Sequence, residues 1–201
     1  MLYPDYTETG YVYHIAPITD LDKILKEGIK YDDKNTYLSK YLKFHKHIDL
    51  HKPDYIPDWV IREKAIFSSM NFHDSHCWHS HTVIMAIKVN PYKCWIANEN
   101  LANKLYEPFI LKDTIGFSCA CDYLKLNEES ILRNYWDTSL SFIDNLETRK
   151  DKEEGYDAEV LIFHDIRFED IKPLFIVSDH HIMSIEQWKE FFSRGTNNGN
   201  R

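Results

Sequence analysis

The sequence predicts an α+β protein that folds as one domain. Short runs rich in β-branched and aromatic residues alternate with segments whose apolar residues recur at helical spacing, so strands and helices are mixed along the chain. With 201 residues, of which 43% are hydrophobic, the chain can bury a substantial core. It has no fixed-period repeat and no long linker, so we expect a single domain over residues 1–193.

The N-terminal part predicts a strand, a short helix and a glycine stop. Residues 11–16 (YVYHIA) are rich in aromatic and β-branched side chains, which favour a strand. Thr19 is a candidate N-cap for the helix that follows, and Gly28 is a candidate C-terminal stop. Residues 34–50 are polar and predict a helical or irregular segment, and residues 65–67 predict the second strand.

The rest of the chain continues this mixture. Four further strands are predicted, at residues 82–89, 93–97, 158–163 and 172–177. The clearest helical periodicity runs over residues 128–147. Ser184 and Gln187 have the spacing of a capping box, which predicts a last helix. The polar, Gly- and Asn-rich tail at residues 194–201 is expected to be disordered.

Charge and composition exclude several classes of protein. A formal net charge of -8 argues against a protein whose affinity rests on a broad phosphate-binding surface, which requires clustered lysine and arginine. Lys40, Lys43 and Lys46 could form a local basic groove, although a solvated helix face is the safer explanation of these lysines.

The apolar runs are too short to cross a membrane and the N-terminus lacks a signal-peptide pattern, so we expect a cytoplasmic protein. Its four cysteines favour free thiols over a disulfide framework.

Two residues within predicted strands are candidates for a functional role. Glu159 is surrounded by apolar neighbours on both sides of the sequence, so neither face of its strand is clearly directed to solvent. A carboxylate in such a strand is either a functional group or a strand-edge residue near water. His14 lies in the middle of the first strand, where a histidine is either a packed, hydrogen-bonded residue or a ligand contact.

The order of these motifs resembles that of a known enzyme family. Residues 13–17 (YHIAP), followed by a short helix that ends at Gly28, are similar to the opening of NAD-dependent ADP-ribosyltransferases of the DarT type, which are DNA-modifying toxins. Residues 66–70 (IFSSM) and residues 158–161 (AEVL) match further family segments in the same order, and the last of these resembles the glutamate strand of the family. The matching segments cover about half of the chain.

The resemblance implies a fold, a reaction and a set of site residues. The fold is a split β-sandwich of two small, mostly antiparallel sheets with flanking helices. Glu159 is the implied catalytic carboxylate, since a fixed negative charge stabilises the oxocarbenium-like ribose that forms when nicotinamide leaves. His14 is implied at the ribose beside nicotinamide. The residues implied to bind NAD are His14, Ile15, Ala16, Tyr37, Phe67, Ser68 and Met70.

The partners that the resemblance implies are NAD, as co-substrate, and an acceptor. The acceptor could be DNA, RNA, a protein side chain or a small molecule, and an antitoxin is a further expected partner. Arg62 and Lys46 are candidates for holding the NAD phosphates, and Tyr41 is an alternative to Tyr37 as the stacking aromatic ring.

Two other functions stay open. A non-catalytic module that binds NAD or a nucleotide derivative would use the same fold. A zinc-dependent hydrolase could be built on the cluster of metal-ligand side chains between His73 and His81, although its spacing matches no common zinc site. A polar group at Asn98, Glu99 and Asn103 could shape the acceptor side of the site or serve only for capping and turns.

Overall fold

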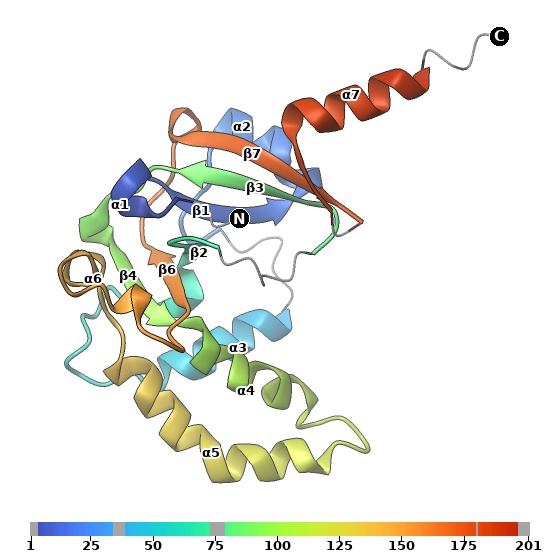
Figure 1. Ribbon diagram of the computed structural model, residues 1–201. Coiled ribbons are helices and arrows are strands. Elements are labelled where there is room, and N and C mark those ends of the chain that lie inside the picture. The colour runs from blue at the N-terminus through green and yellow to red at the C-terminus, as the bar shows by residue number, and fades with distance from the viewer. Residues whose placement is uncertain (1–3, 34–38, 73–78, 180, 197–201) are drawn as a thin grey trace. The chain divides into compact units, whose positions relative to one another are not determined.

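The computed structural model describes residues 4–33, 39–72, 79–179 and 181–196. The chain divides into two compact units, of which the first comprises Met1–Ile29, Ser68–Val89 and Asp165–Arg201. The second comprises Lys30–Phe67 and Asn90–His164. Figure 1 shows the helices and strands that make up each unit.

The first unit is built on antiparallel strands. These are β1 (Val12–Pro17), β3 (Thr82–Ile87), β7 (Ile171–Ser178) and β8 (His181–Ser184), each hydrogen-bonded to the next in this order. Its helices are α1 (Tyr6–Thr9), α2 (Leu21–Glu27) and α7 (Ile185–Thr196), with short 3₁₀ turns η1 (Ile18–Asp20) and η5 (Phe168–Asp170). Tyr13, Phe72, Ile84 and Val177 are among the residues that form its buried core.

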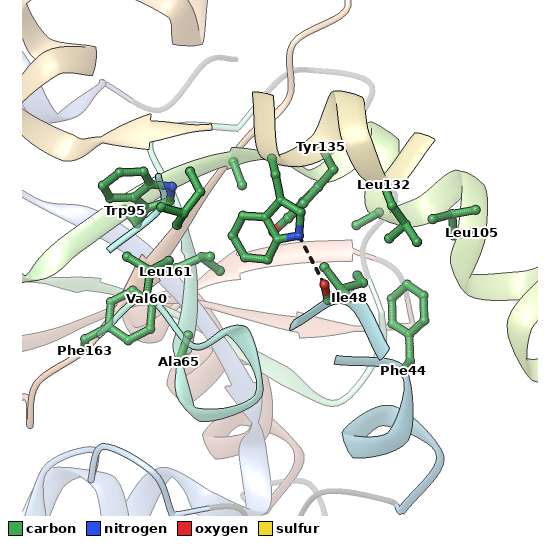
Figure 2. Close-up of a cluster of buried hydrophobic side chains, with 14 of the residues drawn as sticks. Phe44, Ile48, Val60, Ala65, Trp95, Leu105, Leu132, Tyr135, Leu161 and Phe163 are labelled. Carbon is green, nitrogen blue, oxygen red and sulfur yellow. Dashed lines mark hydrogen bonds between the residues drawn. The ribbon is translucent and has the colours of Figure 1, made fainter. Parts of the chain in front are cut away.

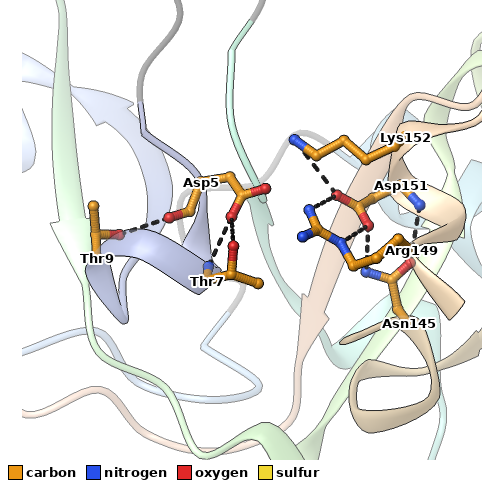
Figure 3. Close-up of polar contacts among 7 residues, drawn as sticks. All are labelled: Asp5, Thr7, Thr9, Asn145, Arg149, Asp151 and Lys152. Atoms are coloured by element: carbon orange, nitrogen blue, oxygen red, sulfur yellow. Dashed lines mark hydrogen bonds and ion pairs between the residues drawn. The ribbon is translucent and has the colours of Figure 1, made fainter. Parts of the chain in front are cut away.

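Local signals set the ends of these helices. Asp5 caps α1, because its Oδ1 accepts a hydrogen bond of 2.7 Å from the backbone N–H of Thr7 (Figure 3). Gly28 ends α2 with a φ of 77°. A Cβ at Gly28 would lie 2.2 Å from the backbone oxygen of Ile166, so only glycine fits there. Ser184 and Gln187 form the predicted capping box, with reciprocal bonds of 2.9 and 3.1 Å.

The second unit combines four helices with a small group of strands. The helices are α3 (Ser39–Asp49), α4 (Glu99–Leu111), α5 (Ser118–Asp137) and α6 (Phe142–Thr148). The strands are β4 (Cys94–Asn98), β5 (Leu140–Ser141) and β6 (Ala158–Ile162), with β4 paired antiparallel to both others. Three 3₁₀ turns connect these elements: η2 (Arg62–Lys64), η3 (Pro91–Lys93) and η4 (Lys150–Lys152).

A large apolar cluster fills the second unit (Figure 2). It joins Phe44 and Ile48 of α3 to Leu105 of α4 and Leu132 of α5, and it continues to Leu161 of β6. Within it the Nε1 of Trp136 donates a hydrogen bond of 3.1 Å to the backbone oxygen of Ile48. This bond satisfies a polar atom that is otherwise surrounded by hydrocarbon.

A polar network holds the turn after α6 (Figure 3). Asp151 accepts two bonds from the guanidinium of Arg149, from Nε at 3.0 Å and from Nη2 at 2.9 Å. It also exchanges bonds of 3.1 and 3.0 Å with the side chain of Asn145, which is fully buried. The bidentate pair fixes Arg149 in the left-handed region, at a φ of 56°.

The strand β2 (Ile66–Ser69) contributes residues to both units. In hydrogen-bonded order the strands run β5-β4-β6-β2-β1-β3-β7-β8, which is one series rather than the two separate sheets expected. The strands form one series because β2 is hydrogen-bonded to β6 on one edge and to β1 on the other. The α+β class and the antiparallel pairing are confirmed, whereas the division into two separate sheets is not.

The helix predicted over residues 128–147 is wrong in its bounds. The helix α5 begins ten residues earlier, at Ser118, and stops at Asp137. At its C-cap, both the N–H and the Oγ1 of Thr138 donate to the backbone oxygen of Asn134, and Ser141 then caps α6 by accepting from the N–H of Asp144. The helix α4 and the strand β8 were not predicted at all. The capping pattern at Asn98, taken as a turn signal, is the N-terminus of α4.

The helix α7 continues to Thr196, into the segment for which we predicted disorder. Among the described residues, no helix is both long and apolar enough to cross a membrane.

Candidate active site

Glu159 lies on a strand that is buried throughout. All five residues of β6 are buried, and Glu159 itself is 4% exposed. Ala97 of β4 is its cross-strand partner, so the two side chains share one face of the sheet. The sequence prediction that neither side of this strand faces solvent is confirmed.

Two side chains from other elements hold one oxygen of this carboxylate. Arg62 Nη1 donates to Glu159 Oε1, and the hydroxyl of Tyr135 donates to the same oxygen at 2.8 Å. Arg62 Nη1 also donates to the hydroxyl of Tyr135 at 2.7 Å, which closes a triangle of hydrogen bonds. Within the described parts of the chain, Glu159 Oε2 accepts no hydrogen bond. One carboxylate oxygen is therefore fixed, while the other keeps its acceptor capacity.

The backbone at Arg62 is fixed by α3. The carboxylate of Asp49 accepts bonds of 2.8 Å from the N–H groups of both Arg62 and Glu63. The guanidinium lies between two rings, with its Cζ 4.8 Å from the centre of Phe67 and 5.3 Å from that of Tyr135. Its Nε is buried and has no hydrogen-bond partner among the residues that the structure describes. Such an unsatisfied donor is uncommon in a buried site and marks a position where a polar ligand could bind.

The charges of this cluster influence one another. Burial disfavours a charged guanidinium, but Glu159 and Tyr135 outweigh that effect, and the pKa of Arg62 is raised. Burial, reinforced by the nearby negative charge of Glu159, raises the pKa of Tyr135 well above its ordinary value. The phenol is therefore neutral, and the guanidinium compensates the buried carboxylate.

A second carboxylate belongs to the same cluster. Glu99 is the first residue of α4 and is half-buried. Burial, followed by repulsion from Glu159 and Asp157, raises the pKa of Glu99 to about 7, against the opposing effects of Arg62 and a hydrogen bond with Asn103. Sequence analysis identified this polar segment but did not connect it with Glu159.

The other predicted site residues lie on the first unit. His14, Ile15 and Ala16 follow one another on β1, where His14 pairs with Met85 of β3. On the other edge of β1, Tyr13 pairs with Ser69 of β2, so His14 and Ser68 are the next residues along these antiparallel strands.

Burial differs among these residues. His14 and Ile15 are half-buried, while Ala16, Ser68 and Met70 are buried. Ser68 Oγ has no hydrogen-bond partner among the described residues. A buried hydroxyl without a partner fits a pocket that receives a polar ligand.

The predicted residues thus fall into two groups. Glu159 and Phe67 both contact Arg62 in the second unit. The second group, on strands β1 and β2 of the first unit, consists of His14 and its neighbours. Tyr37 lies outside the described residues, and its proposed alternative Tyr41 stacks on Tyr106 of α4, with ring centres 5.6 Å apart.

The lysines and histidines that the sequence offered as further candidates do not form a site among the described residues. Lys40, Lys43 and Lys46 are exposed on α3. Most of the predicted zinc cluster, residues 73–78, lies outside the described part of the chain, and His79 and His81 are exposed. Among the residues that are described, no three His, Cys, Asp or Glu side chains are grouped to hold a metal ion.

Among the described residues, three cysteines carry free thiols, as predicted, but Cys119 is exposed where we expected buried or partly buried thiols. They are Cys94, Cys119 and Cys121. Burial raises the pKa of Cys94, which makes that thiol unreactive.

Comparison of the chain with protein-family models, with curated proteins and with solved structures gave no match. The residues of the chain and their geometry are therefore the basis on which a function can be argued.

Proposed function

We propose that this protein transfers ADP-ribose from NAD to an acceptor and releases nicotinamide, with Glu159 as the catalytic carboxylate. The observation that carries the proposal is the state of that carboxylate, whose Oε1 is held by Arg62 and Tyr135 while its Oε2 has no donor among the described residues. An oriented carboxylate with one available oxygen suits a reaction that develops positive charge on a sugar.

The chemistry places specific demands on this group. When the bond between C1′ of the ribose and the nicotinamide nitrogen breaks, the electron pair leaves with nicotinamide and the ribose becomes oxocarbenium-like. Glu159 Oε2 would accept the proton of the ribose 2′-hydroxyl in a hydrogen bond and stabilise the cation electrostatically. The acceptor then bonds to C1′ and loses its proton.

The order of the sequence motifs supports the assignment of NAD as substrate. In the first unit, the histidine strand and the buried Ser68 hydroxyl fit the nicotinamide-binding role that the resemblance implies. In the second unit, Arg62 was a candidate for the NAD phosphates, and its unpaired Nε supports a role in ligand binding.

One observation favours a second candidate, a module that binds NAD without turning it over. Arg62 and Glu159 form an ion pair whose side chains are each 5% exposed, and such pairs also occur as purely structural features. An enzyme would lose NAD turnover when the carboxylate of Glu159 is removed, whereas a binding module would show no turnover even as the wild type.

The experiment compares the wild type with Glu159→Gln. NAD carrying ³²P on its adenylate phosphate is incubated with the protein and with separate pools of DNA, RNA and protein, and nicotinamide release is measured by chromatography. We expect labelled product in one pool, loss of turnover by about 100-fold or more in Glu159→Gln, and NAD binding within a few-fold of wild type by calorimetry.

Two further variants make the result interpretable. Glu154→Gln removes an exposed carboxylate from the loop before β6 and should behave as wild type. Arg62→Met combined with Glu159→Gln removes both charges of the buried pair and is assayed if the single variant fails to fold. Its NAD binding is compared with that of Arg62→Met, because Arg62 is itself a candidate ligand residue. Binding of NAD by the wild type without any nicotinamide release would select the non-catalytic module.

A further inference from the structure

The position of Glu99 is fixed by the start of β6. Its backbone N–H donates to the oxygen of Asp157 at 2.8 Å, directly before β6 begins. The preceding residue, Asn98, pairs with Ala158 in the β4–β6 register. Glu99 therefore lies within two residues of the cross-strand pair that Ala97 makes with Glu159.

Side-chain amides tie the same two segments together. Asn98 Oδ1 accepts bonds from the N–H of Asn100 at 3.1 Å and from that of Asp157 at 3.2 Å. The amides of Asn98 and Asn100 both donate to the backbone oxygen of Gly155, at 3.4 and 3.2 Å. Three of these bonds, together with the bond from Glu99 N–H to Asp157, hold the N-terminus of α4 against the loop before β6.

The two carboxylates of this cluster have opposite environments. Glu159 is buried and forms an ion pair with Arg62. Glu99 is half-buried and feels repulsion from Glu159 and Asp157, attraction from Arg62 and a hydrogen bond from Asn103. Burial and repulsion give it a pKa of about 7, where a carboxylate can accept and release a proton.

Two neighbouring carboxylates with different surroundings, one paired with a cation and one repelled by negative charges, are an arrangement that can divide acid–base work between them. The buried Arg62 Nε, which has no partner among the described residues, independently marks this cluster as a place for a ligand.

We propose that Glu99 is the general base that takes the proton from the acceptor nucleophile, an inference that rests on the proposed ADP-ribose transfer. The O–H or N–H bond of the acceptor breaks and its proton passes to a Glu99 oxygen. The electron pair of the acceptor forms the new bond to C1′, and the pair of the broken glycosidic bond leaves with nicotinamide. Glu99 then returns the proton to water. The acceptor is thus a group that is protonated at neutral pH and must lose its proton on transfer.

The test uses Glu99→Gln and Glu99→Ala in the full chain, assayed with the acceptor pool that the wild type labels. We expect transfer by Glu99→Gln to fall by about 100-fold or more, with NAD affinity unchanged within a few-fold. We expect the transfer rate of the wild type to fall below neutral pH, and this fall should be absent in the variant. Glu107→Gln, an exposed change on the same helix, should leave transfer unchanged.

Azide separates a base from a merely structural residue. Azide is an anion at neutral pH, so it attacks C1′ without losing a proton and needs no base. It should restore nicotinamide release in Glu99→Ala but not in Glu159→Gln. Transfer by Glu99→Gln within threefold of wild type, or a loss that azide does not rescue, would overturn the inference while leaving the proposed function standing. A wild type that never cleaves NAD would remove both.

Discussion

The buried ion pair allows a quantitative prediction about the second unit. Arg62 and Glu159 are each 4% exposed, so Arg62→Met leaves a carboxylate in the interior without its cation. Breaking such a pair from one side costs about 3–5 kcal/mol. This is a large part of the roughly 5–15 kcal/mol by which a domain is stable. Glu159→Gln should cost a comparable amount, because it leaves the guanidinium unpaired.

Removing both charges should recover most of this loss. In the double variant Arg62→Met, Glu159→Gln neither charge of this pair remains, and the glutamine oxygen can still accept from Tyr135. We expect the double variant to be within about 2 kcal/mol of wild type, so that the two single effects are strongly non-additive. Urea unfolding followed by tryptophan fluorescence measures all four proteins, and Trp136 in the adjacent core provides a probe.

An exposed pair on α5 provides the control. Arg133 and Glu129 form an ion pair of 2.7 Å, with side chains 66% and 87% exposed. The matched changes Arg133→Met and Glu129→Gln should each alter the free energy of unfolding by less than about 0.5 kcal/mol. If the buried double variant instead loses the sum of its two single effects, the charges of Arg62 and Glu159 do not stabilise each other and the reasoning fails.

Three further predictions concern single positions. The pKa of Glu99 is about 7 in the folded chain against an ordinary 4.5, so the protonated side chain stabilises the folded state relative to the unfolded state. This stabilisation is complete below pH 4.5, is lost as the pH rises to about 7, and amounts to at most about 3 kcal/mol. The pH dependence should vanish from urea unfolding curves of Glu99→Gln. Gly28→Ala should destabilise the first unit by about 3 kcal/mol in thermal unfolding, because its Cβ would lie 2.2 Å from a backbone oxygen at a φ of 77°; an unchanged melting temperature would contradict this. Ser184→Ala should lower the free energy of unfolding by about 1 kcal/mol through loss of the cap of α7, with Ser193→Ala, near the other end of the helix, as the smaller comparison.

The elements that the sequence predicted correctly are those that nearby residues determine. The strand at Glu159 follows from its apolar neighbours, the end of α2 from Gly28, and the start of α7 from the spacing of Ser184 and Gln187. Each is indicated by residues that lie a few positions apart in the sequence. The one long helix was misjudged because apolar periodicity continues across Thr138, where side-chain hydroxyls take over the last carbonyls.

The surroundings of Glu159 could not be predicted in this way. Its partners Arg62 and Tyr135 are 97 and 24 residues away in the sequence, and Glu99 approaches it only because β4 pairs with β6 in one register. Sequence patterns place this carboxylate in an apolar strand but leave open whether it is buried or lies at a strand edge near water. Which charges compensate it depends on sheet register and helix packing between distant segments, and only the tertiary structure decides these.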